Sequence, residues 1–251
     1  MPHDAPPPRW QVFHAHKHGN AADEYEDAFA GDPIQGRFAV ADGASESSFA
    51  AGWAKLLVEG FLAAEGEPWD ELDWLRPQRQ RWAAEIDDRP LPWYAEDKRD
   101  LGAYATLLGI AFRFPGTDAE SAEWHALAVG DSCLFHLRDG ELLLSFPLTH
   151  SAEFGNLPNL LGSRGRPADT PSQGVQHAQG DWHPVDRFLL MTDALAEWTL
   201  RQIEESGQPT SAFDRLLAEP VPQAAFAEWV EEHRRRHGLR NDDVTLLVID
   251  F

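Results

Sequence analysis

Short apolar runs that end in turn residues alternate along the chain with longer runs of helical spacing. Residues 37–41 form an apolar run that stops at Asp42-Gly43, and its brevity favours a buried strand. From Ser48 onward, apolar residues recur at helical spacing, with Ser47 and Ser48 as N-cap candidates and Gly66 as the stop. The pattern therefore predicts a strand followed by an amphipathic helix.

The next segment, residues 67–99, is rich in both aromatic and charged residues. It predicts one or two further helices that pack their aromatic faces on a neighbour. A partner surface is the alternative interpretation of its tryptophans, but core packing is the default for such residues.

Four strand-like runs then follow in close succession, at residues 104–114, 124–129, 133–137 and 141–146. Asp139-Gly140 between the last two is typical of a type I′ hairpin, so the strands should be antiparallel. A long polar stretch over residues 149–184 has little periodicity and predicts a functional flap.

The remaining apolar patterns predict a strand at 187–192, helices at 195–205, 211–219 and 222–237, and a last strand at 244–251. Antiparallel strands interleaved with helix pairs predict an α+β fold, a β-sandwich covered by helices. No repeat or low-complexity linker divides the chain, so we expect one domain over residues 1–251, with the flap-like segment at about 149–184.

The charge narrows the classes of partner. The 251 residues include 42 Asp and Glu against 21 Lys and Arg, a formal net charge of −21, which argues against nucleic acid and anionic membrane as partners. The single cysteine, Cys133, excludes a disulfide framework within the chain and is expected to be a buried, small apolar residue. No leader and no apolar stretch of about 18 residues is present, which predicts a soluble cytoplasmic protein.

Acidic residues recur where apolar strands begin or end. They are Asp42, Asp131, Asp193, the pair Asp242-Asp243, and Glu26-Asp27 before a further apolar step. Any one of them is most simply a turn or cap residue. If they share one end of a sheet, they form a set of hard oxygen ligands that selects Mg²⁺ or Mn²⁺ over zinc. Two such ions would make a site for phosphate-ester hydrolysis.

Seven blocks of sequence carry a resemblance to a known family. They read EDAFA (26–30), FAVADGAS (38–45), GAYATLLG (102–109), ALAVGDS (126–132), LTHSAE (148–153), LLMTDALAE (189–197) and NDDVTLLVIDF (241–251). In content and order they resemble the metal-dependent serine/threonine protein phosphatases of type 2C, over nearly the whole chain. The resemblance implies two antiparallel sheets between helix pairs, a four-layer α-β-β-α sandwich.

The same resemblance implies a binuclear Mn²⁺ or Mg²⁺ site, with a third ion more weakly bound. Its implied metal ligands are Asp42, which would bridge the two ions, the carbonyl of Gly43, Asp193, Asp242 and, for the third ion, Asp131. Glu26 and Asp27 match the acidic pair that orients metal-bound water. Glu197 falls where the family has another acid near the third ion.

Three positions depart from the family pattern. The usual phosphate-binding arginine is replaced by Ala22, the loop Ala44-Ser45-Glu46 lacks the usual glycines and any histidine at position 44, and Asp193-Ala194 replaces Asp-Gly. Arg164, Arg166 or Lys17 would supply the missing cation, because phosphate needs a positively charged partner.

The expected activity is hydrolysis of phosphoserine and phosphothreonine in proteins by a metal-activated water, with no covalent intermediate. The partners would be a phosphorylated protein and a cognate Ser/Thr kinase. Two alternatives remain open: a catalytically weak regulatory or phospho-binding module, favoured by Ala22 and Ala44, and a hydrolase of small phosphate esters.

Two histidine-containing segments also have a simple explanation. His14, His16 and His18 would share one face of a strand, but alternating polar residues need no metal to explain them. The cluster at 233–237 is most simply a solvated helix end whose cations match the helix dipole.

Overall fold

The computed structural model describes residues 7–44, 49–69, 72–86, 100–114, 122–155, 157–165, 174–207, 213 and 222–251. Within these ranges, none of the helices has both the length and the apolar character needed to span a membrane.

Two five-stranded antiparallel sheets form the centre of the described structure. In spatial order, the first contains β1 (Arg9–Ala15), β12 (Val244–Asp250), β11 (Asp186–Met191), β7 (Cys133–Arg138) and β8 (Glu141–Phe146). The second contains β10 (Val175–Asp181), β6 (Glu123–Val129), β5 (Leu107–Arg113), β3 (Arg37–Ala41) and β2 (Ala28–Asp32). A small third sheet pairs β4 (Tyr104–Ala105) with β9 (Leu161–Gly162).

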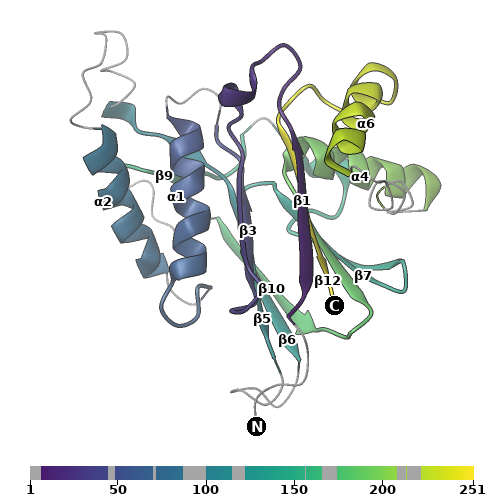
Figure 1. Ribbon diagram of the computed structural model, residues 1–251, viewed down its shortest axis with the longest axis horizontal. Helices are drawn as coiled ribbons and strands as arrows, with labels where there is room; N and C mark the ends of the chain where they lie inside the picture. Colours follow the sequence, from purple (N-terminus) through teal and green to yellow (C-terminus); the bar gives the residue numbers. More distant parts are fainter. Residues whose placement is uncertain are drawn as a thin grey trace.

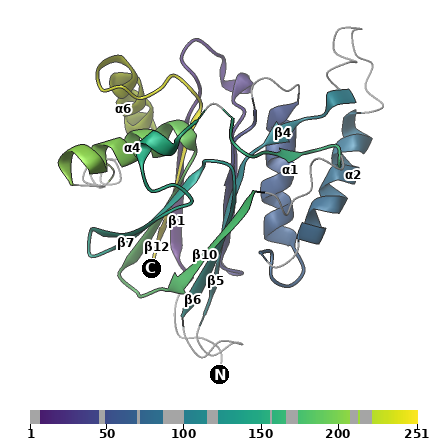
Figure 2. The same ribbon diagram turned by 180° about the vertical axis from the view of Figure 1, so that it is seen from behind.

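Helices cover the outer face of each sheet (Figure 1). On one side lie α1 (Ala50–Ala63) and α2 (Leu75–Ile86), and on the other α4 (Asp193–Ser206) and α6 (Pro222–Arg236). Figure 2 shows the same layers from behind. Short 3-10 helices lie at Ala22–Glu24, Leu72–Trp74 and Ser151–Glu153. The predicted α+β sandwich flanked by helix pairs is confirmed.

Three buried clusters hold the layers together. One lies between the sheets and is rich in aromatic rings, with Phe112 against Phe188 at 5.0 Å and Trp124 against Phe188 at 5.7 Å between ring centroids. The second packs α1 and α2 on one sheet, and includes Trp53, Trp74 and Trp82. The third packs α4 and α6 on the other. Where the structure describes them, the tryptophans of the 67–99 segment therefore contribute to packing, as expected.

Most predicted elements have their expected type. The Asp139-Gly140 hairpin is confirmed by φ values of +52° and +81°, the pair of left-handed residues that a type I′ turn requires. The helix after β3 begins at Ala50, behind Phe49 with φ +69°, so it does not begin beside a serine cap. Ser47, Ser48 and, apart from Phe213, the predicted helix at 211–219 lie outside the described residues.

The predicted irregular stretch at 149–184 needs one correction. Residues Val175–Asp181 form β10, which pairs with β6 along its whole length. The strand lies at the sheet edge and its side chains are half-buried or exposed, so it lacks the apolar signal of an interior strand.

Candidate metal centre

The strand register brings the predicted acids to one end of the sandwich. Met191, the last residue of β11, pairs with Cys133 at the start of β7 and with Leu246 near the start of β12. Asp131, Asp193 and Asp242 flank these three strand ends.

The other sheet supplies two more acids at the same end. Ala41, which precedes Asp42, pairs with Ala28, which follows Asp27. A hydrogen bond from Thr245 of β12 to Asp27 joins the two sheets there. Asp27, Asp42, Asp131, Asp193 and Asp242 are called the carboxylate cluster below.

Mutual repulsion within this cluster shows in the pKa values. Burial, followed by repulsion from the other four members of the cluster, raises the pKa of Asp42 well above its usual range. Burial, with repulsion from Asp193, raises the pKa of Asp131 to about 7. Burial also raises the pKa of Asp193, although the nearby Arg240 opposes the shift. Such a site is short of positive charge.

Asp27 is buried deeply and held on one side only. Its Oδ2 accepts hydrogen bonds from the hydroxyls of Thr245 at 2.7 Å and Thr192 at 3.0 Å. Its Oδ1 is buried and has no hydrogen-bond partner among the described residues. Burial and the nearby Asp243 raise the pKa of Asp27, despite the two hydroxyl donors. One oxygen is therefore fixed and the other is available to a ligand.

The two adjacent acids before β12 have different environments. Both oxygens of Asp243 accept main-chain N–H groups at 2.7 Å, Oδ1 from Lys17 and Oδ2 from Glu26. Asp243 thus ties the segment before β2 to the start of β12. The Asp242 side chain is 35% exposed and turns toward the cations Lys17 and Arg240. This difference favours Asp242, the residue predicted as a ligand, over Asp243.

The loop after β3 leaves no room for a side chain at Gly43. An added Cβ would lie 2.7 Å from the carbonyl oxygen of Glu26 and 3.0 Å from Ala50. The loop is further fixed by two hydrogen bonds between Asp42 and Thr106: the Asp42 N–H donates to the Thr106 hydroxyl at 3.1 Å, and the Thr106 N–H donates to the Asp42 carbonyl at 2.8 Å. Glycine here lets the segments that carry Glu26 and Asp42 approach closely.

Of the three cations predicted to bind the substrate phosphate, the structure describes Lys17 and Arg164. Lys17, just past β1, places Nζ 3.5 Å from Oδ1 of Asp242. Arg164 instead lies over the ring of Trp82, 5.0 Å from its centroid. Arg166 lies outside the described residues. Of the three predicted phosphate-binding candidates, Lys17 contacts the cluster within the described residues.

Arg234 and Arg240 were not anticipated at this end of the molecule. The Arg234 side chain is 5% exposed and donates to the main-chain carbonyls of His16 and Asp242, so this part of the helix end is not solvated as predicted. Arg240 contacts Asp193 and lies 3.8 Å from Asp242. Its position two residues before Asp242 was the one sequence signal available.

The donor set suits a hard divalent cation. It consists of carboxylate oxygens, and the buried Oδ1 atoms of Asp27 and Asp131 have no hydrogen-bond partner within the described ranges. No group of three acidic, histidine or cysteine side chains in the described part of the chain already converges on a metal position. Because Asp193 and Asp242 face Arg240, binding of an ion would require their side chains to reorient.

The remaining candidates have structural roles. Cys133 is fully buried, as predicted, and burial raises the pKa of its thiol. His16 and His18 lie beyond the end of β1, so the three histidines do not share a strand face. His18 instead pairs with Glu231.

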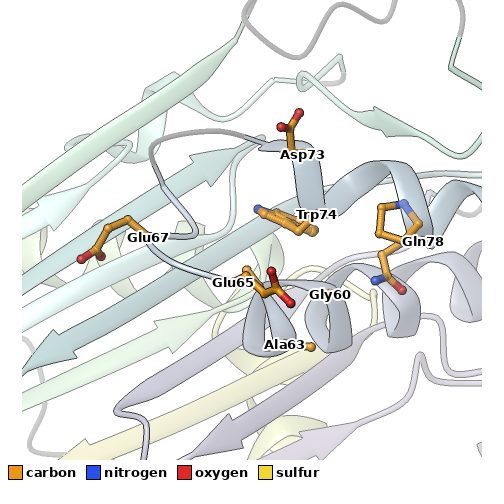
Figure 3. Close-up of a pocket in the computed structure, with 9 residues that line it drawn as sticks. Gly60, Ala63, Glu65, Glu67, Asp73, Trp74 and Gln78 are labelled. Atoms are coloured by element: carbon orange, nitrogen blue, oxygen red, sulfur yellow. The ribbon is translucent and has the colours of Figure 1, made fainter.

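A separate hollow of about 650 Å³ lies beside α1 and α2 (Figure 3). It is lined by Trp74, Gln78 and the acids Glu65, Glu67 and Asp73, among others. It shares no residue with the carboxylate cluster.

Comparison with known proteins places these features in context. The sequence profile described as protein phosphatase 2C matches residues 14–241. The catalytic domain of the serine/threonine phosphatase PstP, in complex with two manganese ions, is similar with a TM-score of 0.60 and 20% identity, covering 97% of this chain and 98% of that one.

Two further solved structures are similar over nearly their full length. The PPM Ser-Thr phosphatase MsPP from Mycobacterium smegmatis, in complex with cacodylate, has a TM-score of 0.59 and 22% identity, covering 98% of this chain and 100% of that one. PppA, a regulatory component of T6SS in Pseudomonas aeruginosa, has a TM-score of 0.56 and 20% identity, with 98% of each chain covered. Curated proteins include no significant match. At these identities, the likeness to solved structures demonstrates a shared fold.

Proposed function

Because the chain belongs to the protein phosphatase 2C family, we propose that it hydrolyses phosphoserine and phosphothreonine in proteins with a water activated by divalent cations at the carboxylate cluster. The observation that carries this proposal is the convergence of five aspartates from both sheets, two of which keep a buried oxygen without a partner among the described residues. An uncompensated buried carboxylate is costly, so such an arrangement favours binding of a cation.

Mn²⁺ or Mg²⁺, when bound, would lower the pKa of a coordinated water and draw electrons from the phosphoryl group. Asp42, the Gly43 carbonyl, Asp193 and Asp242 are the proposed ligands of two ions. The complex of PstP with two manganese ions supports this choice of metal.

The protein would contribute position and proton acceptance. Asp27 is held by Thr192 and Thr245, so its other oxygen is fixed where it can accept a proton from the attacking water. Glu26 would orient water beside it, and its main-chain N–H is anchored on Asp243. Direct attack by this water would leave no covalent phosphoenzyme.

Lys17 is the proposed cation for the substrate phosphate. The position of the family arginine is Ala22, in an exposed 3-10 helix. The Lys17 main-chain N–H is anchored on Asp243, and its ammonium lies beside Asp242. A flexible ammonium can leave one exposed carboxylate for an incoming phosphate at little cost, because surface ion pairs contribute about 0–1 kcal/mol.

The function is tested by release of phosphate from phosphothreonine and phosphoserine peptides, with and without Mn²⁺. Wild type should turn over only with metal, whereas Asp42→Asn and Asp193→Asn should lose turnover while keeping the wild-type circular dichroism spectrum. Asp181→Asn, at an exposed site on β10, is the matched control and should stay active. Wild-type activity in Asp42→Asn would contradict the proposal.

The same assay separates the two alternatives. Metal binding without turnover of any phosphopeptide would support a regulatory module. Turnover of metabolite esters but not of peptides would support a small-molecule phosphatase.

Substrate binding is tested separately. Lys17→Ala should raise KM for phosphopeptides while kcat changes little, and Lys17→Arg should restore KM. Arg164→Ala is the control, because its guanidinium lies over Trp82. Unchanged KM in Lys17→Ala would remove the role of Lys17. The cognate kinase and the cytoplasmic location stay predictions.

A further inference from the structure

Arg240 lies among acids that belong to, or adjoin, the carboxylate cluster. One guanidinium nitrogen, Nη2, contacts Oδ2 of Asp193. Nη1 lies 3.6 Å from Oε2 of Glu197, and Nε lies 3.8 Å from Oδ2 of Asp242. The three nitrogens of one guanidinium therefore face three different carboxylates.

The main chain holds this arginine next to the cluster. The N–H of Asp242 donates to the carbonyl of Arg240 at 3.1 Å, which closes a tight turn just before β12. Asp242 is fixed in turn by Arg234, which donates to its carbonyl. The Arg240 side chain consequently starts from an anchored position, and it is 39% exposed. Arg240 therefore reaches Asp193 and Glu197 without the entropic cost of ordering a long loop.

Asp193 and Glu197, which face Arg240, also act on the charge of Asp131. Burial raises the pKa of Asp131 most, repulsion from Asp193 and Glu197 adds to the shift, and the positive charge of Arg240 opposes it. The Asp131 side chain is buried, at 7% exposure of the residue, and its Oδ1 has no hydrogen-bond partner in the described ranges. Without Arg240, Asp131 and Asp193 would lose this cation, and Glu197 would keep Arg201, at 2.8 Å; carboxylate oxygens of this kind are the donors that a hard divalent ion prefers.

We propose that Arg240 is a tethered cation that takes the place of a third divalent ion beside Asp131, Asp193 and Glu197, so that the chain binds two ions. This inference rests on the proposed function, since it presumes that the other two ions bind. A guanidinium stays protonated and presents donors along a fixed plane, so it can face several carboxylates at once.

The consequence is a difference in metal stoichiometry between variants. Removing the charge in Arg240→Gln leaves Asp131 and Asp193 without this cation, and a divalent cation should then bind beside them. Arg240→Lys keeps a positive charge near the same position and should behave as wild type. Arg201→Gln is a matched control, because Arg201 also pairs with Glu197, at 2.8 Å, whereas Asp193 pairs with Arg240.

The experiment is equilibrium dialysis of the full chain, first stripped with a chelator, against a series of Mn²⁺ concentrations, with bound metal measured by atomic emission. Wild type, Arg240→Lys and Arg201→Gln should each bind two equivalents. Arg240→Gln should bind three, or bind its weakest equivalent at least about tenfold more tightly than wild type does. A second readout, the Mn²⁺-induced rise in Tm, should be larger in Arg240→Gln, because the apo form of this variant is the most strained by repulsion.

Each other outcome counts against the inference. Identical isotherms for wild type and Arg240→Gln would overturn it, as would loss of an equivalent in that variant. An unchanged stoichiometry with a higher KM for phosphopeptides would instead assign Arg240 to substrate binding. If wild type binds two ions and turns over substrate, and Arg240→Gln binds Mn²⁺ with the same isotherm, only the inference about Arg240 is refuted. Wild-type protein that binds no Mn²⁺ refutes the proposed function together with it.

Discussion

The hydroxyl of Thr245 donates a hydrogen bond of 2.7 Å to Oδ2 of Asp27, and this bond joins the two sheets at the carboxylate cluster. Thr245 lies in β12, whereas Asp27 directly precedes β2 of the other sheet. Thr192, which precedes α4, donates to the same oxygen at 3.0 Å. The direction of the Asp27 carboxylate is thus set by two hydroxyls that do not themselves belong to the acidic set.

Replacing Thr245 should therefore weaken metal binding without removing a ligand. In Thr245→Val, Oδ2 of Asp27 loses one of its two hydroxyl donors, and we expect Mn²⁺ affinity to fall about 10–100-fold, as for other groups that orient metal-site carboxylates. Calorimetric titration measures the affinity. Thr245→Ser keeps the hydroxyl and should retain most of it; equal losses in both variants would show that the methyl group, not the hydrogen bond, matters.

Metal binding should stabilise the fold. Wild-type protein should melt at higher temperature in Mn²⁺, by an amount that corresponds to about 2.7 kcal/mol when the metal is at 100 times its Kd. Asp42→Asn should lose this rise. Its metal-free form should be at least as stable as metal-free wild type, because one repelling carboxylate is removed. Differential scanning fluorimetry with and without a chelator measures both effects, and a metal-free Asp42→Asn that melts well below wild type would contradict this account.

Two glycines provide a test of close packing. Gly43→Ala would place a Cβ 2.7 Å from the Glu26 carbonyl oxygen, and we expect a loss of about 1–3 kcal/mol in the free energy of unfolding. Gly52→Ala is the control: Gly52 lies exposed in α1, with open space around its Cβ position. That change should stabilise the protein by about 0.5–1 kcal/mol, because alanine is the better helix former. Urea unfolding compares the two variants; similar effects would refute the packing argument.

A buried carboxylate at the opposite end of the first sheet predicts part of the acid sensitivity. Asp186 accepts two hydrogen bonds from Arg138, at 2.7 and 2.8 Å, and one from His136 at 2.8 Å. Burial alone would raise the pKa of Asp186, but these hydrogen bonds from Arg138 and His136 lower it below the usual value.

Because the folded-state pKa is lowered, the carboxylate contributes its full stability above the unfolded pKa, about 3.9. This stability should be lost as pH falls below that value, through the lower folded-state pKa. Asp186→Asn should reduce the free energy of unfolding at neutral pH by about 1–3 kcal/mol and flatten its decline in acid. The exposed variant Glu141→Gln should change neither. Urea unfolding across a pH series is the measurement, and an unflattened acid limb in Asp186→Asn would contradict the assignment.

Much of the fold was predictable because interior strands carry a clear apolar signal. β3, β5 to β7, β11 and β12 are almost entirely buried, and their sequences are correspondingly apolar. β10 was missed because, at the sheet edge, none of its residues is fully buried: its polar residues are exposed, and Val175, Ala178 and Gly180 are only half-buried. Phe49 could not be anticipated as the residue before α1, because a left-handed backbone is rare for an aromatic residue and no local pattern encodes it.

The acids of the carboxylate cluster were predictable because each lies beside an apolar strand, a pattern that the sequence shows directly. Their hydrogen-bond and ion-pair partners were not predictable. In the sequence, Thr245 resembles any other strand residue, and Arg234 resembles any other charged residue at a helix end. The ion pairs of Arg240 could not be predicted, because they form only when the fold places Asp193 and Glu197 of α4 next to the turn before β12. Such pairings depend on tertiary contacts between elements far apart in sequence.

The bond between Asp27 and Thr245 spans 218 positions of the chain, and that separation has a consequence for when the carboxylate cluster forms during folding. Local helices and hairpins can form early. Contacts between residues this distant form late, because the chain loses loop-closure entropy before the contacts stabilise it. β2, β3, β5 and β6 can assemble from residues 28–129, but β12 must dock between β1 and β11 before the acids of both sheets meet. On refolding from denaturant, tryptophan burial should therefore recover first and enzymatic competence last.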